Sequence, residues 1–324
     1  MKIILANPRG FCAGVEMAID TVQEALKIVG SPLYVYHEIV HNRHVVDRFV
    51  KEGVIFVDHI DEVPAKSTVV FSAHGVSPEV RENARARGCT MIDATCPLVT
   101  KVHMEAIRYA RQGYHILLVG HAGHDEVVGT VGEAPDAICI VESPEEVDRL
   151  PLGPEAKVAY ITQTTLSMDD ANRIIGAIRR KFPNLKEPPS EDICYATTNR
   201  QRAVRELAGE ADLVLVIGSK NSSNSVRLTE ISENGGTAAY LVDDKSEIDQ
   251  TWFQGVRTVL VTAGASAPEY LVKEIVQELI ENYGGEAEEA DVVEEDMDFT
   301  LPLSLRVLQQ GAGARAGAEQ AAPR

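Results

Sequence analysis

Three cysteines stand at equivalent points of the sequence, each where a helix is expected to begin. Each of Cys12, Cys96 and Cys194 is followed by an amphipathic stretch and then by a short apolar run. A cysteine thiolate is a metal ligand, and a helix N-terminus favours its charged form. The three are far apart in the sequence, so no local CxxC spacing marks a metal site. If the fold brings them together, they can ligate three irons of a four-iron cluster and leave the fourth iron free to bind a substrate oxygen.

An internal repeat is the main reason to expect that the cysteines meet. Cys96 lies 24 positions before Gly120, and Cys194 lies 24 positions before Gly218. Counted from the cysteine of its own unit, the first polar loop residue lies at nearly the same offset each time: 29 positions for His41, 28 for His124 and 28 for Ser222. A second loop in each unit carries His74, Thr164 or Ser266. Polar residues at matching offsets indicate three related units.

The loop residues are of types that bind phosphate and move protons. Histidine, hydroxyl and amide donors beside helix N-termini suit a diphosphate, and the candidates are His41, His74, Ser222, Ser223, Asn224 and Ser266. Glu126 follows His124 by two positions and is a candidate proton donor, with the Thr164 hydroxyl as a relay or orienting group. Plainer interpretations exist: Glu126 would also stabilise a first helical turn, and the loop GSKNSSNS could simply be solvated.

The elements that must position these residues are short apolar runs alternating with helical patterns. The clearest strand candidates are residues 2–6, 68–72, 115–119, 158–161, 213–217 and 258–261. Strand, loop and helix in alternation predict the α/β class with parallel sheets, in which ligands bind beyond the carboxyl ends of the strands. We therefore predict three related parallel-sheet α/β units about a pseudo-threefold axis, with the cysteines and polar loops facing a central iron–sulfur cluster.

The repeat also predicts the domain boundaries. We expect a first α/β unit with Cys12 over residues 1–95, a second with Cys96 over 96–193, and a third with Cys194 over 194–283. Residues 284–306 are predicted to form a C-terminal connector and strand, much of it acidic. The alanine- and glycine-rich residues 307–324 are predicted to be a disordered tail.

Composition excludes several classes of protein. With 31 basic and 49 acidic residues the net charge is −18, which argues against nucleic acid or an anionic membrane as the main partner. The sequence has no run of 18 apolar residues, and residues 1–6 are typical of a buried strand rather than of a signal peptide. We therefore expect a cytoplasmic protein.

The remaining cysteines and the missing nucleotide motifs narrow the chemistry. Five cysteines without an export signal argue against a disulfide framework. Cys89 and Cys139 lie in apolar stretches outside the repeat, and we interpret them as packed core thiols. No strand-linked GxGxxG or GxxxxGK[ST] motif is found, so no bound nicotinamide or nucleotide is indicated. Electrons would have to come from another protein or from an external reductant.

Other functions remain compatible with these residues. Three cysteines and a histidine could form a closed zinc site, which would make the chain a zinc-stabilised phosphate-binding protein. A cluster with an open iron could serve a hydro-lyase without net electron transfer. The cluster could also be a redox or iron sensor that a partner protein reads.

The motifs resemble one family over residues 1 to about 306. They are ANPRGFCAGV, HEIVHN, FSAHGVS, DATCPLVTKVH, GHAGHDEV, TQTTLS, DICYATTNRQ, GSKNSSNS and TAGASAP. They resemble those of the 4-hydroxy-3-methylbut-2-enyl diphosphate reductase family, the last enzymes of the non-mevalonate isoprenoid pathway. No motif position departs from the family pattern.

The resemblance implies an activity, a cofactor and a set of site residues. It implies one 4Fe-4S cluster per chain on Cys12, Cys96 and Cys194, and a diphosphate site on His41, His74, Ser222, Ser223, Asn224 and Ser266. His124, Thr164 and Glu126 would lie near the substrate hydroxyl. The implied reaction is a reductive dehydroxylation of the allylic diphosphate to isopentenyl and dimethylallyl diphosphates, with two electrons and two protons. The implied electron donor is ferredoxin or flavodoxin.

Overall fold

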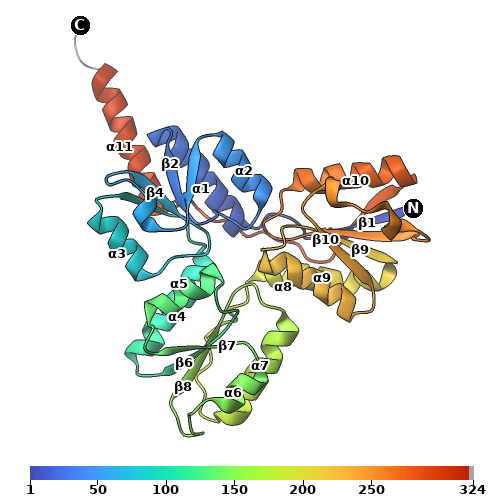
Figure 1. The fold of residues 1–324 in the computed structure, drawn as a ribbon, viewed down its shortest axis with the longest axis horizontal. Helices are drawn as coiled ribbons and strands as arrows, with labels where there is room; N and C mark the ends of the chain where they lie inside the picture. Colours follow the sequence, from blue (N-terminus) through green and yellow to red (C-terminus); the bar gives the residue numbers. More distant parts are fainter. Residues whose placement is uncertain (321–324) are drawn as a thin grey trace.

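Three α/β units surround a common centre as three lobes (Figure 1). A computed structural model describes residues 1–320 of the chain, and the side chains as far as Gly311. Each unit contains one parallel sheet, with strand orders β3-β2-β4-β5, β7-β6-β8 and β10-β9-β11-β1-β12. This arrangement confirms the predicted fold class. Within the described residues, no helix is both long enough and apolar enough to cross a membrane.

The first unit holds the four-stranded sheet. Its strands are β2 (Leu33–Tyr36), β3 (Val54–Val57), β4 (Thr68–Phe71) and β5 (Thr90–Asp93), and its helices are α1 (Ala13–Val29), α2 (Arg43–Lys51), α3 (Pro78–Ala86) and the 3-10 turn Ile60–Glu62. The apolar stripe of α1 packs with Leu33, Val35 and Phe49 into a closed core. Because α1 is fixed in this core, the position of Cys12 at its N-terminus is fixed as well.

The second unit holds the three-stranded sheet and contains a correction. Its strands are β6 (His115–Val119), β7 (Ile138–Val141) and β8 (Val158–Thr162), and its helices are α4 (Pro97–Arg111), α5 (Asp125–Glu133), α6 (Pro144–Arg149) and α7 (Met168–Lys181). Cys139 lies on β7 and is exposed, whereas Cys89 is buried. Our prediction of a core thiol was therefore wrong for Cys139. The reason is that β7 is an edge strand, where side chains in an apolar stretch can still face solvent.

The third unit takes strands from both ends of the chain. Its elements are β1 (Lys2–Asn7), α8 (Tyr195–Leu207), β9 (Leu213–Ile217), α9 (Ser223–Asn234), β10 (Ala238–Val242), β11 (Thr258–Ala263), α10 (Glu269–Tyr283), β12 (Glu286–Asp291) and the 3-10 turns Ala208–Glu210, Lys245–Glu247 and Gln250–Phe253. Strand β1 lies between β11 and β12 in this sheet. The predicted boundaries of residues 1–95 and 194–283 must be corrected accordingly. The apolar residues in the middle of β1 require a sheet that is covered on both faces, but the sequence of the strand does not say which sheet.

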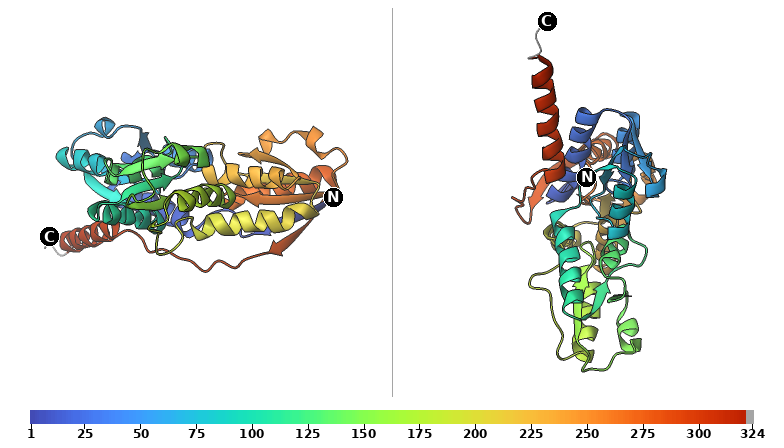
Figure 2. Two further views of the ribbon diagram at one scale, coloured as in Figure 1. Left: turned by 90° about the horizontal axis from the view of Figure 1, so that it is seen from below. Right: turned by 90° about the vertical axis from the view of Figure 1, so that its left-hand side faces the viewer.

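The C-terminal segment crosses the molecule. After β12 the chain runs along the underside of the other elements, in the left view of Figure 2, to α11 (Leu303–Gln320). This helix lies where we expected a disordered tail to begin at residue 307. Two properties explain the difference: alanine favours helix, and Leu305 is fully buried against the first unit. Residues 321–324 of the predicted tail lie outside the described residues.

Candidate functional site

A central cavity collects the N-termini of helices from all three units. The N-cap residues of five helices line it: Cys12 of α1, Cys96 of α4, His124 of α5, Cys194 of α8 and Ser222 of α9. Helix N-termini carry partial positive charge and unpaired backbone N–H groups, so they favour anions. The fold therefore builds a centre suited to thiolates and to phosphate groups.

All twelve residues that the sequence singled out line this one cavity of about 90 Å³. They are Cys12, His41, His74, Cys96, His124, Glu126, Thr164, Cys194, Ser222, Ser223, Asn224 and Ser266. In the described part of the chain, no lysine or arginine side chain lines it. An anion there would be held by helix N-termini and by neutral donors. The separate role of each residue stays a prediction.

The three cysteines are half-buried residues at the cavity wall, and their thiols interact electrostatically. Burial raises the pKa of Cys96 to about 12 and that of Cys194 to about 11, and in both cases the neighbouring Cys12 raises it further. Buried thiols of this kind stay protonated at neutral pH unless a cation compensates their charge. A metal group supplies that compensation and displaces the protons. The donor set therefore fits a cationic cofactor.

The space and spacing around the thiols fit a cluster better than a single ion. A Cβ atom placed on Gly14 would lie 2.7 Å from the Cys96 Sγ and 3.9 Å from the Cys12 Sγ, so only glycine leaves this space open. Among the described residues, the three Sγ atoms do not all lie within 4.8 Å of one another. A single zinc ion, with Zn–S bonds of about 2.3 Å, would hold them closer than that. The spacing therefore speaks against the zinc alternative.

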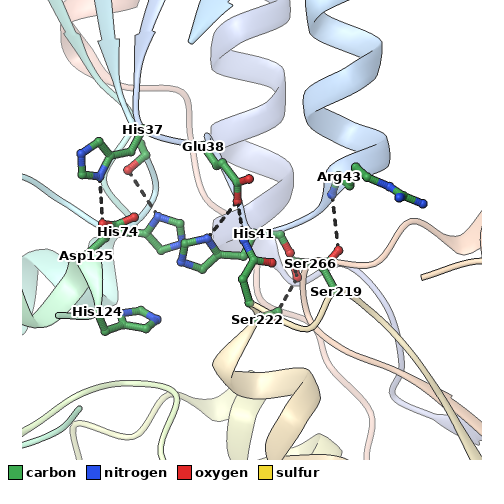
Figure 3. Close-up of polar contacts among 12 residues, drawn as sticks. His37, Glu38, His41, Arg43, His74, His124, Asp125, Ser219, Ser222 and Ser266 are labelled. Atoms are coloured by element: carbon green, nitrogen blue, oxygen red, sulfur yellow. Dashed lines mark hydrogen bonds and ion pairs between the residues drawn. The ribbon is translucent and has the colours of Figure 1, made fainter. Parts of the chain in front are cut away.

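Three histidines form one wall of the cavity (Figure 3). The rings of His41 and His74 are stacked with centroids 4.0 Å apart, and His124 stands edge-on to both. Burial lowers the pKa of His74 well below its usual value and that of His124 to about 4, and the nearby His41 lowers both further. His124 is therefore neutral near pH 7. Its Nδ1 accepts a hydrogen bond from the Glu126 backbone N–H at 3.2 Å, so its proton is on Nε2.

Hydroxyl and amide groups of the third unit form the facing wall. The Oγ atoms of Ser222 and Ser266 are 3.2 Å apart, and the Asn224 amide donates to the Ser222 Oγ at 2.7 Å. Ser266 also donates to the His41 carbonyl oxygen at 3.0 Å, which ties this wall to the first unit (Figure 3). The Ser223 hydroxyl donates to the Thr165 carbonyl oxygen of the second unit at 3.2 Å. Residues from three units thus hold one another in place around the cavity.

Glu126 and Thr164 form a buried pair within the second unit. The Thr164 backbone N–H donates to one carboxylate oxygen at 2.6 Å, and its hydroxyl lies 2.9 Å from the other. Burial raises the pKa of Glu126 to about 7, against the lowering effect of these hydrogen bonds. A carboxyl group with such a pKa can give up a proton at neutral pH, which is what general acid catalysis requires.

Sequence analysis missed several residues that line the cavity. Val15, Val99 and Thr197 each lie three positions after one of the three cysteines, so they occupy equivalent places one turn into their helices. The repeat offset was the signal that could have found them. The Thr197 hydroxyl lies 3.2 Å from the Cys194 Sγ. The missed pair His37 and Asp125, whose Nδ1 and Oδ1 are 2.8 Å apart, joins the first and second units (Figure 3).

The fold and the site together define a three-unit α/β protein with a thiol-lined central cavity, and known proteins share this architecture. A sequence model described as LytB protein matches residues 3–280. A relative from Rhodopirellula baltica is 55% identical over 306 residues, covering 94% of this chain and 96% of its own length. One from Hahella chejuensis is 56% identical over 313 residues, covering 95% and 98%. Both are named 4-hydroxy-3-methylbut-2-enyl diphosphate reductase.

A solved structure extends the similarity to three dimensions. The E-1-hydroxy-2-methyl-but-2-enyl-4-diphosphate reductase of Plasmodium falciparum is 39% identical, with a TM-score of 0.94 over 97% of this chain and 99% of its own. The chain belongs to the LytB family, and the resemblance seen in its motifs is confirmed.

Proposed function

We propose that the chain is a reductase that converts 4-hydroxy-3-methylbut-2-enyl diphosphate to isopentenyl and dimethylallyl diphosphates with two electrons and two protons. The observation that carries this proposal is the identity of about 55% with reductases of that name over nearly the whole of both chains. The single cavity that holds all twelve candidate residues supports it. The substrate is a small molecule, and we propose ferredoxin or flavodoxin as electron donor and the cytoplasm as location.

Cys12, Cys96 and Cys194 are proposed to hold one 4Fe-4S cluster per chain. When bound, such a cluster supplies electrons and, at an iron without a protein sulfur, Lewis acidity toward the substrate hydroxyl. The buried thiols and the space beside Gly14 support this assignment. The protein provides the remaining parts: a site that binds the diphosphate, walls that orient the allyl group, and a proton source.

The diphosphate is proposed to bind between the histidine wall and the serine wall. Neutral His124 donates through Nε2. The hydroxyls of Ser222 and Ser266 and the amide of Asn224 hydrogen-bond to one another without substrate, and they are proposed to turn these donors toward phosphate oxygens when substrate binds. The N-terminus of α9 adds backbone N–H groups and a favourable dipole. Glu126 is proposed to give the proton that lets the hydroxyl leave as water, with Thr164 orienting it.

The proposed function is tested by anaerobic purification followed by iron and sulfide counts and by spectroscopy before and after substrate is added. We expect about four irons and four sulfides per chain, a spectrum that changes with substrate, and product only when a reductant is present. A hydro-lyase would turn over without reductant, and a sensor would bind no substrate. Either result would contradict the proposal.

The diphosphate site makes a second prediction. Alanine at His74 or Ser222 is expected to weaken substrate binding by roughly 10- to 100-fold, because a hydrogen bond to a charged group contributes about 1.5–3 kcal/mol. The absorption spectrum of the cluster should be nearly unchanged. Binding is measured from the change in that spectrum as substrate is titrated.

The exposed histidine His59 provides the matched control, and its replacement by alanine should not alter binding. The alcohol that lacks the diphosphate should bind far more weakly than the substrate. Equal affinity for alcohol and diphosphate would overturn the assignment.

A further inference from the structure

A buried arginine links the segments that carry two of the three cysteines. Arg200 lies on α8, six residues after Cys194, and is only 1% exposed. Its Nε and Nη2 donate to the Gly10 carbonyl oxygen at 3.1 and 2.7 Å, and Nη2 also donates to the Phe11 carbonyl oxygen at 3.2 Å. These two carbonyls immediately precede Cys12. The guanidinium thus holds the Cys12 loop against the helix that begins at Cys194.

The charge of Arg200 is compensated from a distant part of the chain. Its Nη1 donates to the carboxylate of Glu295 at 3.1 Å, and the Asn199 amide donates to the same oxygen at 3.0 Å. Glu295 lies in residues 292–302, the connector that runs along the underside of the molecule from β12 to α11 (Figure 2). The pair therefore fastens this connector beneath the Cys12 loop.

The Cys12 and Cys194 segments also meet at a second contact. The backbone supports the same junction, because the Ala13 N–H donates to the hydroxyl of Tyr195, the residue after Cys194, at 3.2 Å.

We propose that Arg200 and Glu295 are positioning residues for the Cys12 ligand: the guanidinium fixes the Cys12 loop, and the two charges together set the potential of the bound cluster. The inference rests on the proposed function in one respect, the assignment of Cys12 as a cluster ligand. The planar guanidinium fork reaches the Gly10 and Phe11 carbonyls and the Glu295 carboxylate from fixed directions, a geometry that a lysine ammonium centred on one atom does not reproduce. Partners that orient metal ligands commonly contribute 10- to 100-fold in metal affinity.

A purely structural ion pair is the alternative, and the two predict different results. Removing one partner of a buried pair destabilises a protein, whereas replacing both partners by apolar residues often does not. If the pair is only structural, the double variant should therefore recover the stability, the Cys12 reactivity and the cluster properties of the wild-type protein. If the pair positions the Cys12 loop, the double variant should recover only stability, because it still lacks the hydrogen bonds to that loop.

The test uses Arg200→Met, Glu295→Gln and the double variant Arg200→Met with Glu295→Met. Arg205→Met is the matched control, because Arg205 lies on the same helix in an exposed pair with Asp169. Four properties are measured: the rate of Cys12 alkylation in the metal-free full-length chain, the melting temperature, the midpoint potential of the cluster and its resistance to chelator. The first readout needs no cluster, so it tests the positioning role even if the wild-type chain binds none and the proposed function fails.

In Arg200→Met we expect faster Cys12 alkylation, because the loop before Cys12 is no longer held by hydrogen bonds and its thiol becomes accessible. Cluster loss to chelator should be roughly 10- to 100-fold faster, and neither property should change in the control. In the double variant the melting temperature should recover but Cys12 should stay reactive. The midpoint potential should fall in Arg200→Met, which loses a positive charge, and rise in Glu295→Gln, which loses a negative one.

If Arg200→Met does not fold, Glu295→Gln still tests the potential. The proposal would be overturned if the midpoint potentials of the two single variants shifted in the same direction, or if that of Glu295→Gln did not rise. It would also be overturned if Cys12 in the double variant were alkylated as slowly as in the wild-type chain.

Discussion

Serine at Cys12, Cys96 or Cys194 is expected to abolish both the four-iron cluster and turnover. A serine hydroxyl does not ionise at neutral pH, so the variant offers no thiolate at that position, and the remaining two cannot fix the cluster. Iron and sulfide per chain, visible absorption and turnover measure the effect. The loss should be complete for each of the three, because they hold equivalent positions in the three units.

Cys89 and Cys139 provide the internal controls for this prediction. Serine at the buried Cys89 should lower stability only, and serine at the exposed Cys139 should have little effect on any property. Both variants should keep a full cluster and wild-type turnover. A Cys194→Ser protein with its cluster intact and full activity would show that the ligand assignment is wrong.

The repeat predicted the site because matching sequence offsets become matching positions in related units. Cys96 and Cys194 each begin a helix that leads into a strand, and the loop after that strand carries His124 or Ser222. In parallel α/β units the helix N-termini and the strand ends lie on the same edge. The spacing along the chain therefore specified which side chains face the centre before any contact was known.

The contacts that the sequence did not predict depend on how the units sit against one another. Strand β1 joins the third sheet rather than the first, so the junction before Cys12 lies beside α8. This placement brings Arg200 to the Gly10 carbonyl, 190 positions away. Glu295 belongs to an acidic stretch that resembles a solvated connector, and nothing local distinguishes it from its neighbours. Such pairings follow from tertiary packing, which local propensity and periodicity do not encode.

The second large effect is expected at Glu126. Changing Glu126 to Gln preserves the shape of the side chain and a hydrogen bond to Thr164 but removes the titratable proton. Turnover should fall by about 10²–10⁴-fold, the usual contribution of a positioned proton donor. Substrate binding, followed by the cluster spectrum, and iron content should be largely retained. Burial lowers the pKa of His124 to about 4, so His124 is a weaker candidate for this acid near pH 7 than Glu126.

The pH dependence of stability provides an independent check on the same proton. Burial raises the pKa of Glu126 to about 7 from an ordinary value of 4.5, so the native chain holds a proton that the unfolded chain releases. The stabilisation from this proton is complete below about pH 4.5 and is lost as pH rises to about 7. Over that range the metal-free wild-type chain should lose stability relative to Glu126→Gln, as measured by denaturant unfolding of both. Parallel stability curves for the two chains would contradict the raised pKa of Glu126. Near-normal turnover by Glu126→Gln would exclude Glu126 as the acid and move the proton role to His124 or to water.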